Sequence, residues 1–231
     1  MAIETSNDPH AFTDFEHQGW EAISSGYEQH IARLTSQSAS AVLDAAIVDE
    51  GMRLLDVCTG PGMLAAAAVE RCALVIGLDF SAEVVGNARR KVPLAEFQEG
   101  DAQALPFEDD SFDAIVCGFG IIHLPEPQKA LLEMRRVLKS GGRVAASVWE
   151  APKPTNGFGL LYGSIKAHGD LSVPLPHGPD FFQFSENENL TAALRDTGFR
   201  EISVQTVEQT WELSERSGMV KGIMEGAVRA R

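Results

Sequence analysis

Residues 54–62 read Leu-Leu-Asp-Val-Cys-Thr-Gly-Pro-Gly, and this stretch decides the fold. An apolar run ends at the carboxylate of Asp56, and the chain then turns through Gly60 and Gly62 into an alanine-rich segment. Glycine lacks a Cβ, so the turn can adopt unusual backbone angles, and a ligand can approach main-chain N–H groups at a helix start. The stretch therefore predicts a strand, a cofactor-binding turn and a helix.

Two cofactor classes fit a glycine turn of this kind. Residues 60–65 read Gly-Pro-Gly-Met-Leu-Ala and satisfy the loose G-x-G-x-x-A pattern of dinucleotide-binding proteins. A dinucleotide carries an anionic pyrophosphate, however, and its loop normally follows an apolar strand directly. Because Asp56 stands at the strand end here, the turn favours a cationic cofactor.

Two more carboxylates follow the next two predicted strands. Asp79 comes directly after the apolar run 73–78, and Asp101 follows the run 95–100. The carboxyl ends of parallel strands share one edge of the sheet, which is where ligands bind in open α/β folds. S-adenosylmethionine offers a sulfonium, an ammonium, two ribose hydroxyls and an adenine amino group. Each of the three acids therefore has a partner on that molecule.

Four segments in order carry a family resemblance. They are Leu55-Asp56-Val57-Cys58-Thr59-Gly60-Pro61-Gly62, Gly77-Leu78-Asp79-Phe80-Ser81, residues 100–107 leading into Ser111-Phe112-Asp113, and Leu138-Lys139-Ser140-Gly141-Gly142-Arg143. Over roughly residues 50–150 the chain resembles a class I S-adenosylmethionine-dependent methyltransferase, in the group that includes the ubiquinone and menaquinone biosynthesis methyltransferases. One departure is Cys58, which stands where the family often has its first glycine.

The resemblance implies a set of cofactor contacts. Asp79 is expected to bind the ribose hydroxyls, Asp101 the adenine amino group, and Asp56 with the Gly60 turn the methionine portion. In related methyltransferases an aromatic residue of an N-terminal helix closes over the methionine end, and Tyr27 is the candidate here. The remaining cofactor-binding candidates flank these positions and are Cys58, Thr59, Gly62, Phe80, Ala102, Cys117 and Gly118.

His123 is the candidate catalytic residue. It lies in residues 118–125, Gly-Phe-Gly-Ile-Ile-His-Leu-Pro, just after the fourth predicted strand, where the resemblance places the transferable methyl group. Relatives often carry one or two histidines at this point, and this chain has only the second, with Ile122 in place of the first. A general base, a donor that positions the acceptor and a structural hydrogen-bonding residue are the three roles open to it.

Short apolar runs alternate with helical segments through the middle of the chain. The predicted strands are Leu54–Val57, Leu74–Leu78, Glu96–Glu99, Ala114–Cys117 and Val144–Val148, and the predicted helices lie near 63–70, 82–91 and 126–139. Ser81 is expected to cap the second of these helices, and Gly141-Gly142 to end the third. The pattern predicts an α/β fold with a doubly wound, mostly parallel, Rossmann-like sheet.

Other segments surround this core in one predicted methyltransferase domain spanning residues 1–231. Residues 12–48 predict two helices that form a lid, residues 51–150 form the cofactor-binding core, and residues 151–185 form a cap inserted after the fifth strand. The cap is rich in proline, glycine and aromatic residues, and relatives insert the part that covers the acceptor at this point. A flexible aromatic cap suits a hydrophobic small molecule, because it would exclude water.

Residues 186–231 complete the predicted domain. Glu186–Thr197 predicts a helix stopped by Gly198, Arg200–Glu212 alternates like a long antiparallel strand, and Ser214–Arg231 predicts a helix. The family's fold usually ends with a seventh strand in a hairpin with the sixth, and no such strand is visible here. An open sheet edge invites pairing, so a homo-oligomer is an expectation.

The amino-acid composition limits which binding partners are expected. Among 231 residues, 33 acidic side chains outnumber 19 basic ones, giving a net charge of −14, which disfavours nucleic acid as a substrate. The three cysteines, Cys58, Cys72 and Cys117, show neither a disulfide framework nor metal-binding spacing, and no metal is expected. No apolar run approaches a membrane span, and Met1–Ser6 is too polar for a signal peptide, so a cytoplasmic protein without membrane partners is expected.

The leading hypothesis is an enzyme that transfers a methyl group from S-adenosylmethionine to an oxygen, nitrogen or carbon atom of a small, hydrophobic acceptor, leaving S-adenosylhomocysteine as product. One alternative is a protein of this fold that binds the cofactor but catalyses a cyclisation or rearrangement. Another is a non-catalytic partner subunit.

Overall fold

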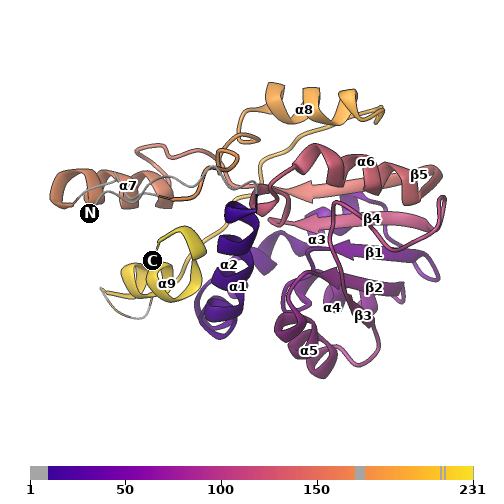
Figure 1. Cartoon of the computed structure of the whole chain (residues 1–231), viewed down its shortest axis with the longest axis horizontal. Helices are drawn as coiled ribbons and strands as arrows, with labels where there is room; N and C mark the ends of the chain where they lie inside the picture. The colour runs from indigo at the N-terminus through magenta and orange to yellow at the C-terminus, as the bar shows by residue number, and fades with distance from the viewer. Residues whose placement is uncertain (1–9, 170–174, 214, 216, 231) are drawn as a thin grey trace.

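The computed structural model describes residues 10–169, 175–213, 215 and 217–230. Its centre is a five-stranded sheet with the order β3-β2-β1-β4-β5, and every neighbouring pair is parallel. The strands are β1 (Arg53–Val57), β2 (Leu74–Asp79), β3 (Glu96–Glu99), β4 (Phe112–Gly118) and β5 (Leu138–Ser147). All five predicted strands and the α/β fold class are thus confirmed (Figure 1).

Helices cover both faces of this sheet. The cluster of buried side chains on one face includes residues of α3 (Ala39–Ala45), α4 (Met63–Glu70) and α5 (Ala82–Lys91). The cluster on the other face includes residues of α6 (Pro127–Val137) and α8 (Asn187–Asp196). The central strands β1 and β4 are covered on both faces and buried over most of their length, which explains their continuous apolar runs.

The three helices predicted within the core, α4, α5 and α6, lie close to their predicted bounds. Ser81 caps α5, because its Oγ accepts a hydrogen bond from the Val84 N–H at 3.3 Å. The prediction that Gly141-Gly142 ends the preceding helix is wrong, because α6 already ends at Val137 and both glycines lie inside β5. Gly141 adopts a φ of +81° near a register irregularity between β4 and β5, so the glycines serve a bulge in the strand.

The N-terminal helices pack in different places. Helix α1 (Ala11–His30) stands across the carboxyl ends of the strands, and the short α2 (Ala32–Thr35) and the 3-10 turn Ser36–Ser38 follow it (Figure 1). Helix α3 packs on the sheet, where Val42 and Leu43 are buried in the hydrophobic core. A lid formed by residues 12–48 stays a prediction.

The C-terminal third departs most from the predictions. Helix α7 (Gly157–His168) lies in the cap region and buries none of its side chains, and α8 ends before Gly198, which has a φ of +89°. The prediction of a long strand over Arg200–Glu212 is wrong, since residues 202–213 form no ladder in the described part of the chain. A strand needs a hydrogen-bonding neighbour, and none of the described residues pairs with this segment.

Helix α9 (Gly218–Gly226) and a 3-10 turn (Val228–Ala230) close the described chain and pack against α1. The predicted single helix Ser214–Arg231 is thus shorter, and its first and last residues lie outside the described residues. The polar start Met1–Ser6 and residues 170–174 of the cap also lie outside them. Within the described ranges, no helix combines the length and the apolar character needed to cross a membrane.

Candidate functional site

The turn after β1 is held in place by Asp56. Its Oδ2 accepts hydrogen bonds from the Thr59 hydroxyl at 2.6 Å and from the Ala65 N–H at 3.1 Å. The turn itself needs left-handed backbone angles, with φ of +55° at Cys58, +56° at Gly60 and +86° at Gly62. The second oxygen, Oδ1, is buried and has no hydrogen-bond partner among the described residues. A buried acceptor of this kind suits a ligand that brings donors or positive charge.

Asp79, at the end of β2, joins the same turn from the neighbouring strand. Its Oδ2 accepts the Gly60 N–H at 2.9 Å, and its Oδ1 accepts the Ser81 N–H at 3.2 Å. A Cβ added to Gly60 would meet no atom within 4 Å, so the space beside the turn is open. A carboxylate has about four acceptor positions, and Asp79 therefore keeps capacity for further donors.

Burial raises the pKa of both carboxylates. For Asp56, burial outweighs the hydrogen bonds from Thr59 and Ala65, and the nearby charge of Asp79 adds to it, so the pKa rises to about 7. Burial likewise raises the pKa of Asp79, although the N–H groups of Gly60, Ser81 and Phe80 act in the opposite direction. Two adjacent acids that ionise reluctantly form a site that is stabilised by a cation.

Asp101 is placed differently. It is exposed just beyond β3, and its Oδ1 accepts the backbone N–H of Gln103 at 2.8 Å and the Gln103 side-chain amide at 3.0 Å. Ala102 beside it is buried. The side chain of Asp101 is therefore held by its own loop and points to solvent at the rim of the site.

One continuous cleft of about 3150 Å³ runs along the carboxyl edge of the sheet. It extends from the β1 turn past the cap to the space between β5 and residues 200–211, which is more than a single small ligand fills. The predicted residues on its wall are Tyr27, Asp56, Cys58, Thr59, Gly60, Asp79, Phe80, Asp101, Ala102, Gly118 and His123. The structure thus brings most of the predicted site together around one space.

Two predicted cofactor contacts do not reach this wall. The Cys117 side chain is fully buried in the core, and its interaction with Cys58, together with burial, raises the pKa of the Cys58 thiol. Gly62 is also absent from the cleft wall, and a Cβ there would press on Val92 at 3.2 Å. Both positions therefore contribute to packing. The spacing of the motif could not predict this, because it does not reveal which of its residues faces the core.

Tyr27 lies on the cleft wall and is already hydrogen-bonded. Its hydroxyl lies 3.0 Å from the Thr35 hydroxyl, and its ring makes an edge contact with Trp20 at 5.2 Å between ring centroids. Burial, and to a lesser degree the charge of Asp79, raises the pKa of Tyr27, so it is a neutral phenol near the acidic turn.

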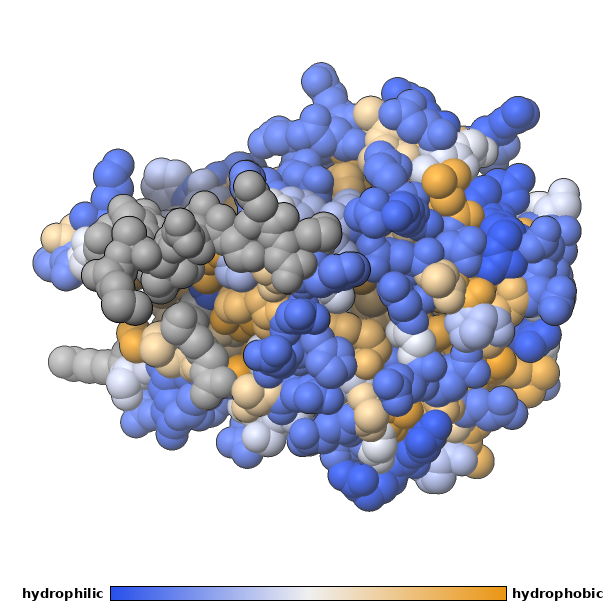
Figure 2. Space-filling view, viewed as in Figure 1, coloured by the Kyte–Doolittle hydropathy of each residue, from blue (hydrophilic) through white to orange (hydrophobic). Residues whose placement is uncertain are grey.

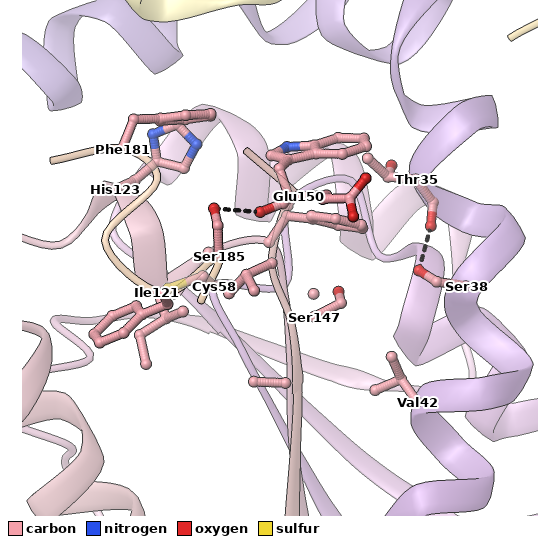
Figure 3. A pocket seen from close by; sticks show the side chains of 18 of the residues that line it. Thr35, Ser38, Val42, Cys58, Ile121, His123, Ser147, Glu150, Phe181 and Ser185 are labelled. Carbon is pink, nitrogen blue, oxygen red and sulfur yellow. Dashed lines mark hydrogen bonds between the residues drawn. The ribbon is translucent and has the colours of Figure 1, made fainter. Parts of the chain in front are cut away.

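His123 lies in a short 3-10 turn after β4, between the acidic turn and the cap. Its Nδ1 is 2.9 Å from Oε2 of Glu16 on α1. Trp20 and Phe181 contact its ring edge-on, with centroid distances of 5.0 Å and 5.6 Å. Figure 3 shows His123 and Phe181 together on one side of the cavity, and Thr35, Ser38 and Val42 on the other.

Aromatic rings continue from His123 into the cap. Phe119 stacks on Trp149 at 4.3 Å, Trp149 contacts Phe158 edge-on at 5.4 Å, and Phe158 contacts Phe182 at 5.3 Å. Ser185 fastens the end of the cap, because its hydroxyl donates to the Trp149 carbonyl at 2.8 Å (Figure 3). The cleft therefore has an acidic end at the turn and an aromatic end at the cap, and His123 lies between them.

Two functional candidates were missed by reasoning from the sequence. Glu16 is 1% exposed and contacts both His123 and Arg229, whose Nε lies 2.7 Å from the Glu16 Oε1. A signal for Glu16 existed, since it interrupts the apolar face that Phe12 and Ile23 share on α1. No sequence pattern singled out Arg229, which follows a short helix near the end of the sequence.

Comparisons with known proteins relate the chain to methyltransferases. Residues 55–146 match a family described as a methyltransferase domain. The demethylmenaquinone methyltransferase of Renibacterium salmoninarum is 40% identical over 177 residues, which cover 72% of this chain and 74% of that protein.

Solved structures show the same fold. A SAM-dependent methyltransferase from Thermotoga maritima superposes with a TM-score of 0.58 at 22% identity, covering 80% of this chain and 81% of that one. The (4+2)-cyclase SpnF superposes with a TM-score of 0.52 at 26% identity; the match covers 71% of this chain and 57% of that one, less than two thirds of its length.

Proposed function

The chain belongs to the class I S-adenosylmethionine-dependent methyltransferases, in the group of the ubiquinone and menaquinone biosynthesis enzymes. On that premise we propose that it methylates a quinone-type acceptor in the cleft between the Asp56 turn and the aromatic cap. The observation that carries the proposal is the pairing of Asp56 and Asp79 around a turn with open space at Gly60.

The residues around the Asp56 turn fit the cofactor. Asp79 would bind the ribose hydroxyls, Asp101 the adenine amino group, and the Asp56 turn the methionine portion, with the unpartnered Oδ1 of Asp56 available to a cationic or donor group. Tyr27 and the rest of the lid would close over the methionine end. Bound there, S-adenosylmethionine supplies an electrophilic methyl group on a positively charged sulfur.

The acceptor's chemistry follows from the other end of the cleft. Trp149, Phe158 and Phe181 offer ring faces and edges to a flat hydrophobic molecule, and the cap over residues 151–185 would exclude water from it. A quinone ring becomes a nucleophile only in its reduced, hydroquinone form, which must lose a phenolic proton. His123 is the residue we assign to take that proton, which contributes about 10²–10⁴-fold in rate when the base is well placed.

Calorimetry with the methyl donor tests the cofactor site. Asp79→Asn keeps the shape of the side chain but removes its charge, so we expect S-adenosylmethionine affinity to fall about 10- to 100-fold, the range for hydrogen bonds to charged groups. The matched control is Asp196→Asn, an exposed acid at the end of α8 that does not line the cleft. Unchanged affinity in Asp79→Asn would reject the assignment.

A second candidate function has one observation in its favour. The similarity of the fold to that of a (4+2)-cyclase supports a non-methylating reaction as the alternative. Under that alternative the cofactor is not consumed. Formation of S-adenosylhomocysteine in step with product would reject it.

A further inference from the structure

The two oxygens of the Glu16 carboxylate contact different side chains, one of His123 and one of Arg229. Oε2 lies 2.9 Å from Nδ1 of His123, and Oε1 lies 2.7 Å from Nε of Arg229. The Glu16 side chain is 2% exposed, and those of His123 and Arg229 are 17% and 16% exposed. All three therefore meet in a largely dry position on the wall of the cleft.

This arrangement keeps Glu16 ionised despite its burial. Burial alone would raise the pKa of Glu16, but the hydrogen bonds and charges of His123 and Arg229 together outweigh it, and the pKa lies below its ordinary value. Burying an ion pair in this way is weak as a source of stability, because an apolar side chain in the same place is often equally stable or more so. A role in ordering His123 accounts for an acid at this position on the apolar face of α1.

An ionised carboxylate can only accept hydrogen bonds, so Nδ1 of His123 must carry the ring proton. In the neutral imidazole the lone pair is then on Nε2. That atom makes no hydrogen bond within the described residues, and His123 lines the cleft. The edge contacts from Trp20 and Phe181 fix the plane of the ring.

Arg229 connects the Glu16–His123 pair to three other segments of the chain. Its guanidinium also donates to the carbonyls of Ile122 at 3.1 Å and Pro179 at 3.3 Å, and it lies over the rings of Phe12 and Phe181 at 5.0 Å and 5.2 Å. These partners come from α1, from the turn after β4 and from the cap. Correct orientation of His123 therefore requires that all three segments are docked.

We propose, on the basis of the function proposed above, that Glu16 is a positioning residue for His123. Glu16 holds the imidazole as the Nδ1–H tautomer, so that Nε2 can take a proton from the methyl acceptor. Arg229 in turn holds Glu16 in place. In the reaction the phenolic O–H bond of the hydroquinone breaks and its proton moves to Nε2. An electron pair of the phenolate, on oxygen or delocalised onto the ring, forms the bond to the methyl group while the carbon–sulfur bond breaks, leaving a neutral thioether. Where a ring carbon is methylated, the hydrogen on that carbon is then lost as a proton to water and the aromatic ring is restored. Glu16 stabilises the imidazolium until His123 releases its proton to water.

The test compares Glu16→Gln with Glu21→Gln, a half-exposed acid on the same helix. A glutamine can present either its oxygen or its NH₂ group to Nδ1, so it no longer imposes one tautomer. With a prenylated naphthohydroquinone as acceptor, we expect kcat of Glu16→Gln to fall roughly 10²–10⁴-fold, as for loss of a correctly protonated base. The S-adenosylmethionine Kd should stay within twofold of wild type, and Glu21→Gln should match wild type in both.

Nitrogen NMR of the His123 ring supplies a readout that needs no acceptor. We expect wild type to show Nδ1 protonated and Glu16→Gln to show a mixture of tautomers. Should Glu16→Gln fold poorly, Arg229→Gln removes the side chain that holds Glu16. We then expect a mixture of His123 tautomers and a loss of kcat smaller than in His123→Ala, and a wild-type kcat with a single tautomer would contradict the role of Arg229.

The outcomes of these experiments test the role of Glu16 separately from the proposed methyl transfer. If His123→Ala is impaired while Glu16→Gln keeps wild-type kcat, the role of Glu16 is wrong and the proposed function stands. If the wild type transfers no methyl group to any acceptor, the proposed function falls; a single His123 tautomer in both wild type and Glu16→Gln would overturn the positioning role on its own.

Discussion

Asp56 shows how much of a site can be predicted when its contacts are local. Its partners, Thr59 and Ala65, lie three and nine residues away, so a short motif encodes the whole arrangement. Glu16 and His123 are 107 residues apart, and Glu16 and Arg229 are 213 apart. No local pattern encodes such pairs, because they exist only once helix α1, the turn after β4 and the chain's end have packed together.

The raised pKa of Asp56 makes the stability of the cofactor-free protein depend on pH. The folded-state value of about 7 lies above the ordinary value of 3.8, so the native state binds a proton that the unfolded chain releases. The free energy of unfolding should therefore fall as pH rises from about 4 to about 7, by at most about 4 kcal/mol. Asp79 contributes in the same direction.

Urea unfolding at several pH values between 4 and 8 measures this dependence. Asp56→Asn cannot ionise, and we expect the difference in stability between the variant and the wild type to shift in the variant's favour across this range. A difference that stays constant with pH would contradict the assignment of a proton to Asp56.

At the scale of the elements, strands were predictable where they are buried on both faces, as in β1 and β4. The segment 200–213 shows the limit, since alternation of apolar and polar residues describes a strand only if a neighbouring strand is present to pair with it. The packing of α9 on α1 was not predictable either. It depends on glycines at the crossing, where a Cβ at Gly26 would lie 2.1 Å from the Glu225 carbonyl oxygen.

Gly26 should therefore tolerate no side chain. In Gly26→Ala the two helices must separate, and we expect a loss of about 1–3 kcal/mol in the free energy of unfolding, as for overpacking in a core. Gly163→Ala in α7 is the matched control, because a Cβ there meets no atom within 4 Å and should stabilise the helix by about 0.5–1 kcal/mol. Equal effects of the two substitutions in urea unfolding would show that the α1–α9 contact is not close in solution.

At the scale of the whole molecule, the face drawn in Figure 2 is mostly hydrophilic, as a net charge of −14 suggests, and apolar side chains are visible between the polar ones. The sheet ends at β5, which pairs only with β4 within the described chain. Sequence patterns predicted the acidic end of the cleft but not how far the cleft extends. Its other walls come from the cap, α1 and the C-terminal turn, which meet only in the folded molecule.

The open edge of β5 leads us to expect self-association, since unpaired backbone groups on an edge strand favour pairing with another chain. Sedimentation over a range of protein concentrations should show a dimer. A monomer at every concentration would mean that residues 200–213 shield the edge well enough on their own.

Transfer of an isotopically labelled methyl group tests the central claim most directly. The purified chain is incubated with S-adenosylmethionine labelled at the methyl carbon and a prenylated naphthohydroquinone, and the products are analysed by mass spectrometry. The structure predicts an acceptor heavier by one labelled methyl group and an equal amount of S-adenosylhomocysteine. An acceptor that rearranges without a change in mass, with the donor intact, would contradict it.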